Sequence, residues 1–120
     1  MGDLSNNFSR YEFACHCGCG FDNIDELLVH YLQTIRNQLG HSVKILSGCR
    51  CKQHNENVGG EKNSAHLRGK AADVVCQTSK DRFDIISMAM ILGINRIGIY
   101  RDFLHLDVDT TLPRPVIWYG

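Results

Sequence analysis

The sequence has 120 residues, and 13 lysines and arginines balance 13 aspartates and glutamates, so the formal net charge is zero. A chain of this length can bury enough surface to fold without metal or disulfide support, and we expect one domain over residues 1–120. The balanced charge and the lack of a basic run argue against nucleic acid or an anionic membrane as the main partner.

The first residues have neither the basic segment nor the apolar segment of a secretory signal. Apolar runs also stay well short of the roughly 18 residues that a membrane span needs. We therefore expect a protein that is made in the cytoplasm without a signal peptide and acts as a monomer. In that setting, six cysteines favour reduced thiols or metal ligands over a disulfide framework.

The stretch from Cys15 to Gly20 is rich in thiols and glycines and predicts a tight loop. Its spacing, with Cys15, Cys17 and Cys19 at alternate positions, does not match the C-x-x-C pairs of common zinc fingers. A metal could be held there if the chain wraps around it. The unusual spacing favours buried or loosely paired thiols over a metal site in this loop, which would be additional to the candidate site described below. A thiol-based metal or redox protein is therefore one alternative function.

Apolar residues at intervals of three and four predict two long helices. The first begins at a cap on Asp22 or Asn23 and ends just before Gly40, a left-handed C-cap. The second is capped by Ser79 and runs to about Leu92. Its apolar side is expected to belong to the core and to carry Phe83, Ile86, Met88 and Met90.

Short segments of small, apolar or alternating residues predict a further helix at 52–58 and strands at 43–47, 71–76, 96–100 and 103–109. In the last of these strands, the two-residue period places His105, Asp107 and Asp109 on one face and apolar residues on the other. The tail beyond Pro115 is expected to be extended, with its aromatic residues packed on the body of the protein.

Two imidazoles and one carboxylate mark a candidate zinc site. Three such ligands, at His66, Asp73 and His105, would leave the fourth tetrahedral position free for water, as in catalytic rather than structural zinc sites. Gly69 permits a sharp turn between His66 and Asp73. An aspartate within an apolar strand is strongly disfavoured unless something pairs with it. We therefore expect one zinc ion per chain and a small zinc hydrolase.

The stretch Ser64-x-His66-x-x-Gly69-x-Ala71-x-Asp73 resembles the signature of the zinc D-alanyl-D-alanine peptidases, a family that includes carboxypeptidases, dipeptidases and phage endolysins. Further matches to that family pattern extend the resemblance from about residue 8 to residue 109. They are Ser47-Gly48-Cys49-Arg50, residues 55–60 and Asp102-x-x-His105-x-Asp107. The resemblance implies zinc held by His66, Asp73 and His105. It also implies an α+β fold shared with the hedgehog domain, in which a small antiparallel sheet carries the metal and helices pack on one face.

The implied activity is hydrolysis of peptide bonds that involve D-amino acids in peptidoglycan stem peptides, by an enzyme of the D-Ala-D-Ala carboxypeptidase or endolysin type. The implied general base is Asp102, and Asp107 is either a rival base or a group that orients an imidazole. Arg50 would stabilise the carbonyl oxygen as charge develops, unless it forms only a surface salt bridge. Ser64 would bind substrate, unless it only shapes a turn.

The expected setting is a phage-type lysin that acts on the cell wall. The pattern does not distinguish removal of a terminal D-alanine from cleavage of a dipeptide or cleavage within the stem. A hedgehog-like module that binds zinc without turnover is the alternative function. Arg68 and Lys70, which flank the ligand segment, are either solvated charges or contacts for a substrate carboxylate.

Overall fold

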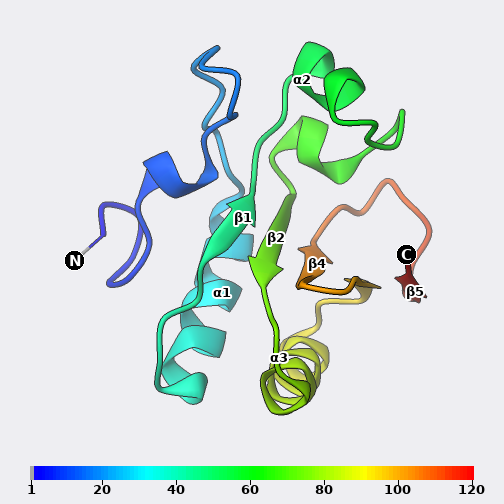
Figure 1. Ribbon diagram of the computed structural model, residues 1–120. Coiled ribbons are helices and arrows are strands. Elements are labelled where there is room, and N and C mark those ends of the chain that lie inside the picture. The colour runs from blue at the N-terminus through cyan, green and yellow to red at the C-terminus, as the bar shows by residue number, and fades with distance from the viewer. Residues whose placement is uncertain (1) are drawn as a thin grey trace.

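A computed structural model describes residues 2–120 of the chain. In chain order its elements are η1 (Arg10–Phe13), α1 (Glu26–Leu39), β1 (Ile45–Ser47), α2 (Lys52–Asn57), η2 (Ala65–Arg68), β2 (Ala71–Val75), α3 (Ser79–Leu92), β3 (Arg96–Ile99), β4 (Phe103–Asp107) and β5 (Val116–Tyr119), where η denotes a 3₁₀ helix. Helices and strands are mixed along the chain, which confirms the predicted α+β class (Figure 1).

The strands form one sheet in the order β1-β2-β4-β3-β5. The first four pair antiparallel with their neighbours, as expected. The tail is extended, as predicted. The prediction did not include its pairing: the tail forms a fifth strand, β5, that pairs parallel with β3 from Arg96 beside Val116 to Ile99 beside Tyr119. The sheet is therefore mixed, and its last strand adds aromatic residues to the edge beyond β3.

One face of the sheet packs on α1 and α3, which also contact each other, whereas α2 lies near one end of the sheet (Figure 1). The sheet contributes apolar side chains to this core, and those from the central strands are Ala72, Val74, Ile97, Leu104 and Leu106. Since successive side chains of a strand point to opposite faces, their neighbours in β2 and β4 point away from the helices. Among the described residues, no helix combines the length and the apolar character needed to cross a membrane.

The helix boundaries follow local capping interactions. Helix α1 begins later than predicted because its N-cap is Asp25, whose carboxylate accepts a hydrogen bond from the Leu28 N–H at 3.0 Å. Its end is as predicted, at Gly40 with a left-handed φ of 77°. Helix α3 covers the expected residues, but Thr78 rather than Ser79 is its N-cap.

The predicted inner face of α3 is partly wrong. Phe83 and Met90 are 72% and 57% exposed, whereas Ile85 and Ala89 are buried against the core. Apolar residues occur on several sides of this helix, so their spacing alone does not determine which side meets the sheet. Ile86 and Met88 pack partly against the core, as expected.

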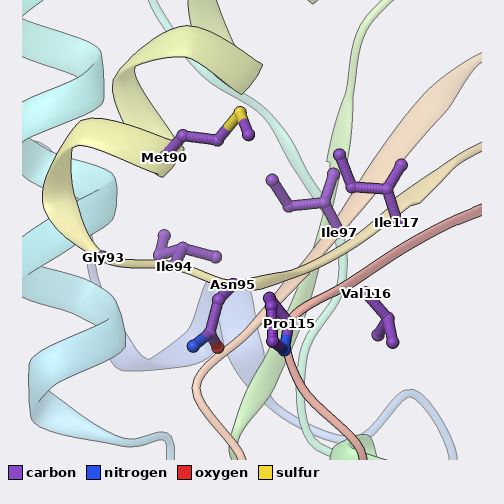
Figure 2. A pocket seen from close by; sticks show the side chains of 8 residues that line it. All are labelled: Met90, Gly93, Ile94, Asn95, Ile97, Pro115, Val116 and Ile117. Carbon is purple, nitrogen blue, oxygen red and sulfur yellow. The ribbon is translucent and has the colours of Figure 1, made fainter.

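Between the end of α3 and the β3–β5 edge lies a hollow of about 330 Å³ (Figure 2). The side chains of Met90, Ile97 and Ile117 line it together with other apolar residues, and Asn95 is the polar residue among them. It offers no titratable group for acid–base chemistry or metal binding.

Candidate metal centre

A larger, open cavity of about 1010 Å³ lies on the sheet face that points away from α1 and α3. Its lining comes from β1, β2, β3, β4, β5, α2, η2 and the loops near them. Unlike the apolar hollow, it is lined by histidines, carboxylates and arginines. His66 and Asp73 are seven residues apart and His105 lies 32 residues beyond Asp73, and the three meet in this cavity.

His66 lies in η2, a single turn with a cap at each end. The Ser64 hydroxyl accepts a hydrogen bond from the His66 N–H at 3.1 Å, and Gly69 ends the turn with a φ of 67°. On the imidazole, Nδ1 lies 2.6 Å from the Gly48 carbonyl oxygen and must therefore carry the proton. The free nitrogen, Nε2, is 3.2 Å from Asp73 Oδ1.

Asp73 and His105 are direct cross-strand neighbours in the register of β2 and β4. His105 Nδ1 lies 3.0 Å from the same Asp73 oxygen that faces His66. The other nitrogen, His105 Nε2, lies 2.7 Å from Asp107 Oδ2. Arg96 Nε donates to both oxygens of Asp107, at 2.9 and 3.0 Å. These contacts of the fully buried Asp107 are those that a group orienting the imidazole would make, and its role stays a prediction.

The three side chains fit a tetrahedral zinc ion. Their ligand atoms all lie within 4.8 Å of one another. Zinc bonds of 2.0–2.1 Å would place tetrahedral ligand atoms about 3.3 Å apart, close to the 3.0 and 3.2 Å that separate Asp73 Oδ1 from the two imidazole nitrogens. Each histidine has its other nitrogen occupied by an oxygen, as is usual for histidine ligands. Three protein ligands leave one position for water or substrate.

The electrostatics of the site suit a cation. Burial opposes ionisation of Asp73, but hydrogen bonds from His105 and His66 outweigh it and hold the pKa of the carboxyl well below its usual range. Burial also opposes a charge on His105, but its contacts with Asp107 and Asp73 outweigh burial and raise the pKa of the imidazole. The carboxylates of Asp73 and Asp107 therefore favour a positive charge between them. A bound metal ion would supply that charge in place of a proton on His105.

Arg50 lies beside the same carboxylate. Its Nη2 is 3.4 Å from Asp73 Oδ2, its Nη1 donates to Asn55 Oδ1 at 2.8 Å, and its Nε donates to Ser47 Oγ at 3.2 Å. The guanidinium is mostly buried and lines the cavity, so it is not a surface salt bridge. Gly60 makes this arrangement possible, because a Cβ atom there would lie 2.6 Å from Arg50 Nη1.

The predicted base, Asp102, is not brought to the three ligands. It lies in the bend before β4, is exposed, and is not among the residues that line the cavity. It precedes His105 by three residues, about 10 Å along an extended chain. Its role as a base stays a prediction.

Other predicted residues have structural partners. The Ser64 hydroxyl caps η2 while its side chain also lines the cavity, so a contact with substrate stays a prediction. Arg68 Nε lies 2.6 Å from Asp109 Oδ2, and Lys70 Nζ lies 2.5 Å from Asp25 Oδ2. Both cations therefore form ion pairs while remaining partly exposed to solvent, and neither lines the cavity.

The cavity also contains residues that the sequence did not single out. Trp118 on β5 lies beside His105, with ring centroids 5.2 Å apart, and its indole N–H donates to the Tyr100 hydroxyl at 2.9 Å. Glu61 and His16 line the rim. None of these three positions follows from local spacing, because the parallel pairing of β5 and the folding of two loops bring them to the site.

Comparison with known proteins supports this reading of the site. A profile of the Peptidase M15 family matches residues 6–109, a segment that includes the three candidate ligands and Arg50. Comparison with curated proteins gives no match. The matched segment covers most of the chain, and its cavity holds a ligand set suited to the metal on which that family depends. The chain therefore belongs to the peptidase M15 family of zinc-dependent, D-Ala-D-Ala carboxypeptidase-like metallopeptidases.

Proposed function

We propose that this protein hydrolyses peptide bonds that involve D-amino acids in peptidoglycan stem peptides. The observation that supports hydrolysis is the convergence of His66 Nε2 and His105 Nδ1 on Asp73 Oδ1 within an open cavity. The signature around these residues supports the substrate class. The setting that we propose is a phage-type lysin acting on the cell wall.

His66, Asp73 and His105 would hold zinc, which in such sites lowers the pKa of a coordinated water and polarises a carbonyl group. In this proposal Arg50 donates hydrogen bonds to the carbonyl oxygen as negative charge develops on it. The reach of its guanidinium to the carboxylate of a candidate ligand supports this role. Asn55 and Ser47 hold the guanidinium in that direction. Trp118 forms an aromatic wall against which part of the substrate can pack.

Replacing Arg50 tests this role. Loss of one donor to a developing oxyanion lowers turnover by about a hundred- to thousandfold, so Arg50→Ala should show such a loss while zinc content is unchanged. The control is Arg101→Ala, at an exposed arginine in the bend before β4. Equal activities of Arg50→Ala and the wild type would exclude the proposed role.

Sequence and geometry favour different proton acceptors. The family pattern implies Asp102, whereas the cavity lining includes Glu61, a carboxylate on the loop before η2. The Glu61 carbonyl accepts from the Asn55 side-chain amide at 2.8 Å, which fixes the loop next to Arg50. Comparing Asp102→Asn with Glu61→Gln separates the two, because the true acceptor loses turnover and retains zinc.

The substrate is tested by incubating the zinc-loaded protein with purified peptidoglycan and identifying the released fragments by mass spectrometry, with His66→Ala as the inactive control. Release of D-alanine would identify a carboxypeptidase, and shortened stems would identify an endopeptidase. A free D-Ala-D-Ala substrate tests for a dipeptidase. The proposal fails if the loaded protein releases nothing from any of these substrates.

One observation favours the hedgehog-like alternative, a module that binds zinc without turnover. Asp107 is engaged by Arg96 and His105, and Asp102 lies outside the cavity lining, so neither predicted carboxylate is poised as a base. Tight zinc binding without hydrolysis of any stem peptide would support this alternative.

A further inference from the structure

Four cysteines gather beside the cavity without taking part in the site described above. Cys15, Cys17 and Cys19 belong to the loop that follows η1, and Cys51 precedes α2. The four sulfur atoms, here called the thiol cluster, all lie within 4.8 Å of one another. None of the four is in a disulfide.

The loop folds so that its alternate cysteines face one centre. The N–H of Cys15 donates to the Phe21 carbonyl at 2.8 Å, which closes the loop at its base. Gly18 and Gly20 have φ values of 80° and 92°, a region that favours glycine, and they let the chain turn back within a few residues. The C-x-C-x-C spacing, which argued against a zinc site, is thus compatible with thiols that point together.

Burial alone does not account for this arrangement. Cys15 is buried, but Cys17 and Cys19 are exposed, so the cluster is not an apolar packing contact. The cluster joins two segments more than thirty residues apart, with Cys15 Sγ 3.4 Å and Cys51 Sγ 3.5 Å from Cys17 Sγ. Such convergence of thiols is typical of metal coordination.

The distances fit tetrahedral coordination by sulfur. Zinc–sulfur bonds of 2.3 Å would place the sulfur atoms about 3.8 Å apart, near the 3.4 and 3.5 Å separations in the cluster. Backbone N–H groups also point at the sulfurs, from Cys51 to Cys15 Sγ and from His54 to Cys51 Sγ, each at 3.4 Å. These donors would offset part of the negative charge of coordinated thiolates.

We propose that the thiol cluster binds a second zinc ion in a closed, structural site. Four thiolate ligands fill a tetrahedral zinc ion and leave no position for water, so this site has no hydrolytic role of its own. It does not depend on the proposed function, because it shares no ligand with the centre at His66, Asp73 and His105.

The position of the thiol cluster indicates what this zinc would do. Cys51 directly follows Arg50, and His16 lies between two of the cluster cysteines and lines the cavity. The His16 ring packs edge-on against His54 of α2, with centroids 6.0 Å apart. Zinc in the cluster would therefore hold the first loop against the Arg50 segment and fix this part of the cavity rim.

The test is the metal content of the full chain purified under reducing conditions. Wild-type protein should hold about two zinc ions, one at each four-coordinate site. Cys17→Ser and Cys19→Ser change exposed residues and should each lose one ion, whereas His66→Ala should lose the other. The matched control is Cys76→Ser, at a buried cysteine outside the cluster whose thiol faces the Thr78 carbonyl.

Cobalt substitution gives a second readout that does not depend on activity. Thiolate-to-cobalt charge-transfer absorption should be present in the wild type and in His66→Ala, and absent in Cys17→Ser. If the cysteine variants unfold, the comparison of the wild type with His66→Ala still decides the question. A single zinc ion in the wild type, two ions retained in Cys17→Ser, or a mass that shows disulfides within the cluster would overturn the proposal.

Discussion

The indole of Trp118 lies directly over Gly98, and a Cβ atom at Gly98 would be 2.7 Å from the indole ring. Gly98 pairs with Trp118 on β5 and with His105 on β4, so the three residues form one row across the sheet. Because glycine leaves the middle of this row empty, the indole can reach the imidazole of a candidate zinc ligand.

Gly98→Ala should push Trp118 out of the cavity. Overpacking of this kind costs about 1–3 kcal/mol of stability. We expect a raised KM with zinc content unchanged, because Trp118 is not one of the three candidate ligands. Trp118→Ala should raise KM in the same way without overpacking. Steady-state kinetics with a stem peptide and metal analysis check both variants. An unchanged KM in both would show that Trp118 does not bind substrate.

Removal of any of the three candidate ligands should abolish tight zinc binding at this centre and leave any zinc in the thiol cluster in place. His66→Ala, Asp73→Ala and His105→Ala each leave two protein ligands, too few for a stable catalytic site. A chelator should likewise abolish activity, and added zinc should restore it. His30→Ala, at an exposed histidine on α1, is the control and should keep both zinc and activity. A zinc content equal to that of the wild type in all three ligand variants would exclude this centre.

Asp107→Asn distinguishes an orienting carboxylate from a base. Because Asp107 accepts from His105 Nε2 and is held by Arg96, we expect zinc affinity to fall by about 10–100-fold. A base would instead show unchanged zinc affinity and lost turnover. Zinc titration against a competing chelator measures the affinity, and kinetics at saturating zinc measures the turnover that remains.

Asp25→Asn should destabilise the protein in a pH-dependent way. Burial opposes ionisation of Asp25, but hydrogen bonds from Lys70 and the Leu28 N–H outweigh it and lower the pKa of the carboxyl. A lowered pKa stabilises the fold above the pKa of the unfolded chain, and this stability is lost as pH falls through the folded pKa. The expected loss at neutral pH is about 1 kcal/mol, since the Lys70 ammonium is partly exposed.

Urea unfolding of wild type and Asp25→Asn across acidic and neutral pH tests this expectation. The two midpoints should converge at low pH, where both side chains are neutral. The substituted asparagine can still cap α1 through its side-chain oxygen, so the comparison isolates the charge. A midpoint difference that stays constant with pH would mean that the ion pair with Lys70 contributes nothing.

Local signals predicted the elements well where the chain itself determines the end of a helix. Gly40 and Gly93 end α1 and α3 with left-handed φ values, which glycine adopts at no steric cost. The side of α3 that is buried depends instead on where α1 and the sheet lie. The buried side of α3 is therefore determined by tertiary packing, which leaves Phe83 and Met90 exposed.

The same distinction applies to the site. Residue types and spacing singled out His66, Asp73 and His105, and the structure brings them together. The alternation of β4 could place His105 and Asp107 on one face, but it could not show that Arg96 would engage the carboxylate. The position of Trp118 in the cavity could not be predicted, because parallel pairing between distant segments leaves no periodic signal in the sequence.

The three candidate ligands converge only when β2 and β4 pair in the native register, so zinc binding depends on correct folding. A slip of one residue would place Leu104 or Leu106 opposite Asp73 and turn the imidazole of His105 toward the helices. Such a chain would have no convergent ligands, so zinc would bind only the correctly paired sheet and would stabilise that pairing over its neighbours. The metal that equips this cavity for hydrolysis would therefore add to the preference that the apolar core already gives to the pairing that builds the cavity.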